Sequence, residues 1–232
     1  ELQVLSLKTH KKLIQKTKSN NNIEAPGWLK VFRTQSSYEK YSYELDVLDK
    51  NKAEYTLLNS EEIRTKFPDL QIEYYKGVLF KNSLRVKSPL ELSKNYFKYF
   101  IKSGGSFYKE ICKDIKFING HWTIYLNKNK KIFDEVVICT GPWSKDFLSN
   151  LGYKIPLAWE RGYHHHFKTK KDIDISPAIH DVDGGFVYSC NKNEIRVTSG
   201  VELNFRGADL NEEQINEVVQ KLKTILPLKN KL

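Results

Sequence analysis

Three consecutive histidines, His164 to His166, are the residues whose type first suggests metal chemistry. Consecutive side chains of a strand point to opposite faces, so at most His164 and His166 share one side. Two ligands without further Cys, Asp or Glu partners make a weak site, because structural zinc takes four ligands. We therefore expect no metal centre here, and a strand with one packed face and one polar face.

The segment 134–144, DEVVICTGPWS, predicts a strand that ends at a ligand. Its four apolar residues, 136–139, stand between acidic residues and the Gly-Pro pair, as in a strand that is covered on both faces of a parallel α/β sheet. Ligands of such sheets bind at the carboxyl ends of strands, which draws attention to Thr140 and Gly141. If Gly141 were only a turn residue, its place before Pro142 would favour extended backbone.

No phosphate-binding loop accompanies this strand end. The twelve glycines form no G-x-G-x-x-G and no G-x-x-x-x-G-K-[ST], so the 232 residues lack a nucleotide fingerprint of their own. The motifs H-E-x-x-H and G-x-S-x-G are absent as well. Asp181, Asp183 and Glu202 fall near expected strand ends, where surface acids are common, so these patterns leave the catalytic residues unassigned.

The composition is that of a globular chain with one large domain or two small ones. No run approaches the roughly 18 apolar residues of a membrane helix. The first residues, ELQVLSLKTHKKL, have no apolar run preceded by positive charge, so we expect no signal peptide there. The net charge of +10 comes from lysines that are spread along the chain among acids, so we expect no nucleic-acid partner. Methionine is absent, even at position 1, and we expect the native protein to be longer.

The three cysteines are isolated in the sequence, which suits a reducing compartment and argues against a disulfide framework or a zinc site. They are Cys112, Cys139 and Cys190.

Hydrophobic periodicity predicts helices and strands along the whole chain. Helices are expected at 1–18, 36–50, 59–68, 89–102, 143–151 and 211–226. Strands are expected at 28–32, 55–58, 77–80, 106–111, 113–118, 121–126, 130–140, 157–167, 184–190 and 194–203. Capping boxes are expected at Asn59 with Glu62, at Ser88 with Glu91 and at Asn211 with Gln214. The helix from Pro89 is expected to turn Leu92, Tyr96, Phe97, Phe100 and Ile101 inward.

Five segments together resemble one enzyme family. They are LLNSEEIRTKFPDL, VVICTGPWS, LGYKIPLAWERGYHHHF, DGGFVYS and IRVTSGVEL. Their order and spacing are similar to those of the FAD-dependent oxidoreductases that include D-amino acid dehydrogenase, glycine oxidase and sarcosine oxidase. The resemblance covers most of residues 27–228, and no single motif carries it alone.

The resemblance implies an α/β fold of the mixed α+β kind, with a mixed-sheet substrate domain and an inserted part of a Rossmann-like FAD domain. Residues 1–75 and 151–232 would form the two parts of the substrate domain, and residues 76–150 the portion of the FAD domain. The family's N-terminal glycine loop and its C-terminal flavin segment, with a substrate-binding arginine, have no counterpart in these 232 residues.

The resemblance also implies cofactor contacts. Thr140 and Gly141 would approach the FAD diphosphate and ribityl region, where glycine lets the backbone come close. Trp143 would pack beside them, and Cys112 would reach the adenine through its backbone. The chain departs from the family at Pro142, where a small residue is usual, and it is shortened near Cys112, which weakens that placement.

Further residues would line the substrate pocket under the same resemblance: Tyr163, Phe186, Tyr188 and Glu202. Arg161 has two interpretations, as a partner of the substrate carboxylate or as a structural ion-pairing residue. Sheet packing is the competing explanation for the aromatic residues.

The implied activity is oxidation of the C–N bond of an amino acid or related amine, by hydride transfer to FAD and hydrolysis of the imine. A deprotonated amine can release hydride directly, so no protein base is required. The electrons would pass to oxygen or to a respiratory carrier. We expect a cytoplasmic enzyme, with peripheral attachment to the inner membrane as a second option. The alternatives are a non-catalytic, sheet-rich binding module and a basic nucleic-acid binder.

Overall fold

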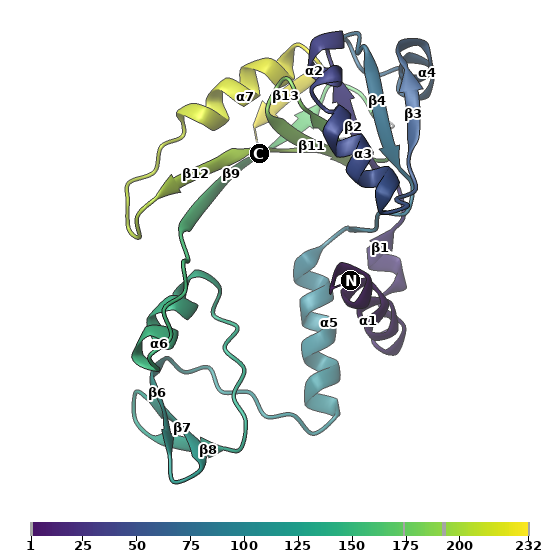
Figure 1. Cartoon of the computed structure of the whole chain (residues 1–232). Helices are drawn as coiled ribbons and strands as arrows, with labels where there is room; N and C mark the ends of the chain where they lie inside the picture. The colour runs from purple at the N-terminus through teal and green to yellow at the C-terminus, as the bar shows by residue number, and fades with distance from the viewer. Residues whose placement is uncertain (1, 174, 192–193, 232) are drawn as a thin grey trace. The chain divides into compact units, whose positions relative to one another are not determined.

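The computed structural model describes residues 2–173, 175–191 and 194–231 (Figure 1). The chain divides into two compact units. Unit 1 comprises Glu1–Tyr99, Gly162–Val201 and Asp209–Leu232, and unit 2 comprises Phe100–Arg161 and Glu202–Ala208. Assignment of these segments to a substrate or a flavin domain stays a prediction.

Unit 1 is built on an eight-stranded mixed sheet. Its strand order is β13-β9-β12-β11-β10-β2-β4-β3. The bounds are β2 Trp28–Phe32, β3 Thr56–Asn59, β4 Lys76–Phe80, β9 Trp159–Thr169, β10 Ala178–Asp181, β11 Phe186–Asn191, β12 Glu194–Asn204 and β13 Leu228–Lys231. Strands β2 and β10 pair in parallel, whereas β2 with β4 and β10 with β11 pair antiparallel. The expected mixed sheet is therefore confirmed.

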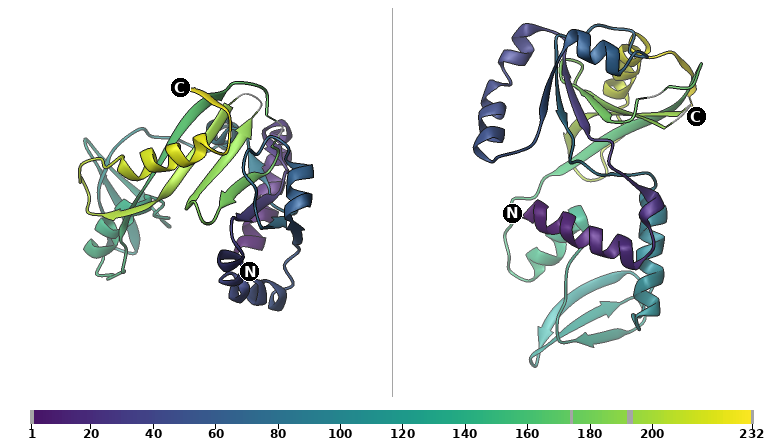
Figure 2. Two further views of the ribbon diagram at one scale, coloured as in Figure 1. Left: turned by 90° about the horizontal axis from the view of Figure 1, so that it is seen from above. Right: turned by 90° about the vertical axis from the view of Figure 1, so that its right-hand side faces the viewer.

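Helix α7, Glu213–Lys223, supplies the main cover of this sheet (Figure 2). Its buried residues Ile215, Val218 and Leu222 belong to the same core cluster as the sheet residues Leu29 and Ile195. In β2, Leu29 and Val31 belong to this core and Trp28 and Lys30 are more exposed, while Phe32 is buried in a second cluster. The expected capping box at Asn211 is wrong, since the N-cap position falls on Glu212.

Unit 1 also contains further helices and a two-stranded sheet of β1 and β5. They are α1 Leu2–Lys16, η1 Asn20–Asn22, β1 Ile23–Glu24, α2 Gln35–Glu39, α3 Ser42–Lys50, α4 Ser60–Lys66 and β5 Arg85–Val86. The expected capping box at α4 is confirmed: Asn59 accepts from the Glu62 amide, and the Glu62 carboxylate accepts from the Asn59 amide.

Helix α5, Pro89–Lys102, begins where the Ser88-Pro89 signal predicted, and the Ser88 hydroxyl accepts from the Glu91 amide at 3.3 Å. Its expected inward face is only partly confirmed. Leu92 is buried, but Phe97, Phe100 and Ile101 are more than 40% exposed. The periodicity predicted the apolar stripe of α5 correctly, but in the described part of the chain few residues pack on the C-terminal half of this stripe.

Unit 2 contains a three-stranded antiparallel meander and one short helical segment. The meander consists of β6 Cys112–Ile118, β7 His121–Leu126 and β8 Lys130–Phe133. A 3₁₀ turn, η2 Gly141–Trp143, leads into α6 Ser144–Asn150. The first residues of β9 and the last of β12 also belong to this unit.

One expected strand, 106–111, is wrong, and the expected strand 130–140 is confirmed only over β8. Residues 134–140 form no strand, and Val137 is 83% exposed. A strand that is covered on both faces needs strands beside it and helices above and below it. Among the described residues, none pairs with 134–140, so the apolar run has the composition of a buried strand without the neighbours of one.

Candidate functional site

The turn that follows the apolar run has an open backbone face. Gly141 has a φ of +57°, which is the left-handed region, so the extended backbone expected before Pro142 is wrong. A Cβ atom built on Gly141 would meet no heavy atom within 4 Å. The Trp143 amide donates to the Thr140 carbonyl at 3.2 Å, and the Thr140 and Ser144 hydroxyls lie 3.1 Å apart. Hydrogen bonds between its own residues therefore hold the turn, while the outer side of Gly141 is not packed.

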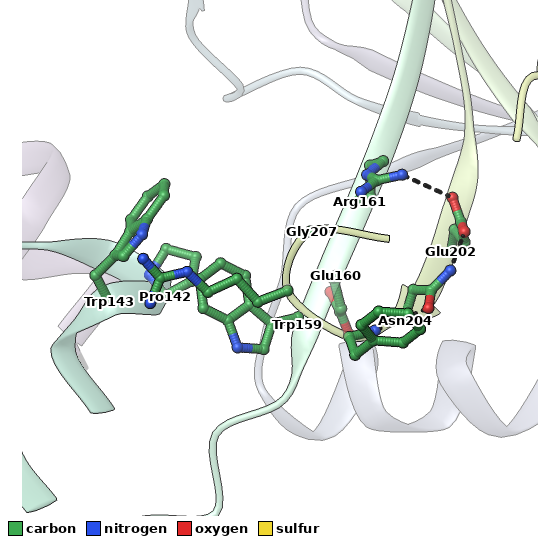
Figure 3. Close-up of a pocket in the computed structure, with 10 residues that line it drawn as sticks. Pro142, Trp143, Trp159, Glu160, Arg161, Glu202, Asn204 and Gly207 are labelled. Carbon is green, nitrogen blue, oxygen red and sulfur yellow. Dashed lines mark hydrogen bonds and ion pairs between the residues drawn. The ribbon is translucent and has the colours of Figure 1, made fainter. Parts of the chain in front are cut away.

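A pocket of about 300 Å³ lies beside this turn, entirely within unit 2 (Figure 3). Its volume is at the lower end of the range of small-molecule sites. It brings together three of the residues that the sequence singled out, Trp143, Arg161 and Glu202. The other lining residues are Pro142, Trp159, Glu160, Asn204, Phe205, Arg206 and Gly207.

One wall of the pocket is charged. Arg161 and Glu202 point toward each other, with 3.9 Å between Nη1 and Oε2. Arg161 also donates from Nη2 to the Ala208 carbonyl at 2.7 Å, and Nδ2 of the Asn204 side chain donates to Glu202 Oε1 at 2.6 Å. Both side chains are less than 30% exposed, so the pair is fixed by several contacts rather than by its own charge alone.

The opposite wall is aromatic. The Trp143 and Trp159 rings meet edge to face, with centroids 5.5 Å apart and planes at 89°. The Arg206 guanidinium lies 5.7 Å from the Trp159 ring and donates to Asp146 Oδ2 at 2.9 Å. Our sequence interpretation missed Trp159 and Arg206. Trp159 could have been found, because it stands two residues before Arg161 and so shares its face of the strand.

The other expected site residues are not among those that line this pocket. Phe186 and Tyr188 are buried in the core of unit 1, and burial raises the pKa of the Tyr188 phenol well above its ordinary value. The Tyr163 hydroxyl accepts from the Asn211 amide at 3.0 Å. Cys112 begins β6, and burial raises the pKa of its thiol. These contacts show sheet packing around the aromatic residues; the substrate and adenine roles stay predictions.

The histidine run lies on β9. The rings of His164 and His166 meet at 5.5 Å, and His166 Nδ1 lies 2.8 Å from Glu194 Oε1. Burial lowers the pKa of His164, and the charge of Arg196 lowers it further. Across residues 2–173, 175–191 and 194–231, no three His, Cys, Asp or Glu side chains form a group that could hold a metal ion.

The sequence pattern of one family, DAO: FAD dependent oxidoreductase, matches residues 1–231. The chain belongs to this family. It is 22% identical over 226 residues to D-amino-acid oxidase of Bradyrhizobium diazoefficiens, covering 94% of the chain and 53% of that protein. It is 23% identical over 197 residues to D-amino acid dehydrogenase of Helicobacter pylori, covering 84% and 47%. The chain thus spans about half the length of the curated relatives it matches.

Solved structures of flavoenzymes share the fold. Glycine oxidase of Bacillus cereus superposes with a TM-score of 0.77 at 19% identity, covering 98% of this chain and 64% of that one. Glycine oxidase of Geobacillus kaustophilus gives 0.81 at 11% identity, covering 97% and 60%. The resemblance inferred from the five sequence segments is confirmed, and so is FAD as the cofactor of the family. The match does not favour a non-catalytic module.

The residues of unit 2 fit one part of an FAD site. A Cβ atom at Gly141 would have no heavy atom within 4 Å, so this side of the backbone has room for a ligand atom. A diphosphate commonly rests on backbone amides at the start of a longer helix behind a glycine-rich loop. The sequence contains no such loop, so the turn could form only one part of an FAD site.

None of the helices in the described ranges is long and apolar enough to span a bilayer.

Proposed function

We propose that the protein containing this chain is an FAD-dependent oxidoreductase that oxidises the C–N bond of an amino acid or related amine. The match of the family pattern to residues 1–231 carries this proposal. The names of the two curated relatives, an oxidase and a dehydrogenase of D-amino acids, support the substrate class. Bound FAD would supply the acceptor for the hydride on the carbon that bears the amine.

The turn at the end of the apolar run is the proposed cofactor contact of this chain. The open face of Gly141 would let the backbone approach the diphosphate and ribityl region, with Thr140 and Trp143 at its sides. Cys112 would contact the adenine through its backbone. Residues 76–150 would then be the part of the flavin domain within this chain, and residues 1–75 and 151–232 the substrate domain.

The charged wall is the proposed substrate side of the pocket. The contacts of Arg161 with Glu202 and with the Ala208 carbonyl support a structural role for this arginine. Held in this way, the Glu202 carboxylate could accept a hydrogen bond from an N–H of the substrate amine. Tyr163 stays a further candidate for a substrate contact, whereas the burial of Phe186 and Tyr188 in the core of unit 1 favours sheet packing for these two residues.

The electron acceptor is proposed to be oxygen or a respiratory carrier. We place the protein in the cytoplasm, with peripheral attachment to the inner membrane as the second option. Oxygen consumption during turnover would identify an oxidase. Turnover that requires an artificial dye would identify a dehydrogenase.

Flavin content tests the proposal. The purified protein that contains these residues should be yellow, and amino acids should reduce its flavin in the absence of oxygen. A folded, colourless protein that binds no added FAD would refute the proposal.

The 232-residue chain alone is expected to bind FAD weakly, because the diphosphate normally rests on a glycine loop and helix start that it lacks. Titration of FAD into the isolated chain measures this. A submicromolar dissociation constant would contradict the expectation.

A further inference from the structure

Three contacts link four side chains of unit 2 beside the turn at 140–143. Trp143, in η2, packs edge to face on Trp159, at the start of β9. The Arg206 guanidinium lies over the Trp159 ring and pairs with Asp146. Asp146 lies in α6, the helix that follows the turn, three residues after Trp143. We call these four residues the Trp143 clamp.

The loop that carries Arg206 is anchored independently of the Trp143 clamp. The Phe205 amide donates to the Asn204 side chain at 2.8 Å, and the Ala208 amide donates to the Phe205 carbonyl at 3.2 Å. Arg161 holds the Ala208 carbonyl at 2.7 Å. Arg206 therefore contacts Trp159 and Asp146 from a loop whose backbone is hydrogen-bonded both before and after Arg206. A residue that positions another side chain needs such a fixed backbone.

The turn itself needs such support. Gly141 adopts a left-handed φ of +57° with no heavy atom within 4 Å of its Cβ direction, so its outer face lacks packing. Trp143 is 49% exposed. Among the described residues, the Trp159 ring is the aromatic partner that restrains the Trp143 side chain.

We propose that Trp159 and Arg206 are positioning residues for the cofactor: through Trp143 they hold the turn at 140–143 in the geometry that contacts FAD. This inference rests on the proposed function, since it assumes that the turn lies at the flavin. It adds two residues that act through Trp143 and that need not touch the cofactor or the substrate.

The Trp143 clamp is suited to positioning more than to stabilising the fold. The side chains of Arg206 and Asp146 are 57% and 59% exposed, and exposed ion pairs stabilise proteins little. An exposed cation over an aromatic ring also contributes modestly. Removing Arg206 should therefore leave unfolding almost unchanged, while the turn samples more conformations and the FAD contact weakens.

The test compares Arg206→Ala and Arg206→Lys with the matched control Lys94→Ala. Lys94 forms a similar exposed pair with Glu91 in α5, with side chains 52% and 56% exposed. In the flavin-loaded protein, Arg206→Ala should raise the FAD dissociation constant about three- to tenfold and change the visible spectrum of the flavin. Arg206→Lys should restore part of both, and Lys94→Ala should match the wild type.

A second readout needs no flavin. Indole rings at 5.5 Å couple optically, so the aromatic circular dichroism of the 232-residue chain should report the Trp143–Trp159 contact. Arg206→Ala should weaken this signal without a change in the unfolding midpoint. Trp159→Phe, which keeps an edge-to-face ring, should bind FAD better than Trp159→Leu.

The outcomes separate this inference from the proposed function. A wild-type protein that holds no FAD would refute both. A wild-type protein that holds FAD, together with an Arg206→Ala variant of equal FAD affinity and unchanged spectra, would refute only the Trp143 clamp. Equal losses in Arg206→Ala and Lys94→Ala would also overturn it, because the effect would then belong to any exposed charge pair.

Discussion

Replacing Gly141 by asparagine separates a cofactor contact from a simple turn. The φ of +57° disfavours most side chains, by about 1–2 kcal/mol, but asparagine tolerates this region better than other residues with a Cβ atom. No heavy atom lies within 4 Å of the added Cβ. In the chain alone, we therefore expect Gly141→Asn to lower the free energy of unfolding by less than about 1 kcal/mol. Valine would be a poor probe, because a β-branched side chain is strained at a positive φ whether or not FAD is bound.

The flavin-loaded protein should respond differently. If FAD lies against the open face of Gly141, the asparagine side chain occupies its place, and the loss of affinity should be at least about tenfold, or 1.4 kcal/mol. The assay pairs urea unfolding of the chain with FAD titration of the loaded protein. Gly120→Asn is the matched control, because Gly120 also has a positive φ, +82°, and open space around it. A Gly141→Asn protein that retains flavin as well as the Gly120→Asn protein would refute the assignment.

Three further predictions concern buried groups. Asp181→Ala should lower the free energy of unfolding by about 3–5 kcal/mol, because its carboxylate is fully buried and pairs with Arg33 at 2.7 Å; a loss below about 1 kcal/mol in urea would contradict this. Burial, and then a nearby lysine, lowers the pKa of His180 from 6.5, so the folded state binds fewer protons than the unfolded state. The neutral His180 side chain therefore stabilises the folded state above pH 6.5, and this stabilisation is lost as the pH falls toward the folded pKa. His180→Gln should reduce the slope of the free energy of unfolding against pH in this range; an unchanged slope would contradict the prediction. Burial raises the pKa of Cys190 to about 12, so thiol reagents should modify exposed Cys139 in the folded chain and reach Cys190 only after unfolding; equal rates at both thiols would contradict this.

Local signals in the sequence predicted most of the elements. The capping box at Asn59 and the Ser88-Pro89 start of α5 depend on residues within one turn, so they could be recognised without knowledge of the fold. The expected strand 28–32 and the expected helix 211–226 also correspond to β2 and α7. These features are encoded by neighbours in the sequence.

The errors arose where structure depends on distant partners. The apolar run 136–139 has a strand composition, but a strand exists only when another strand pairs with it. Phe97 and Phe100 form an apolar stripe on α5, and periodicity does not reveal what covers such a stripe. The expected backbone at Gly141 was wrong because the preference of a residue before proline is weaker for glycine than the demands of the turn.

The candidate site was predictable in part. Motif order placed Trp143, Arg161 and Glu202 among the site residues, and the structure brings these three to one pocket. Arg206 could not be found from the sequence, because its contacts with Trp159 and Asp146 join segments that are about 50 and 60 residues apart. Their meeting depends on where β9 begins and β12 ends, which no local pattern encodes.

The most direct test of the central claim is reduction of the bound flavin by an amino acid without oxygen. Flavin-loaded protein is mixed anaerobically with a panel of D-amino acids, glycine, proline and simple amines, and the flavin absorption is followed. We predict that at least one member of the panel bleaches the flavin and yields the corresponding imine or keto acid. A flavin that dithionite reduces, but that stays oxidised with every member of the panel, would contradict the claim.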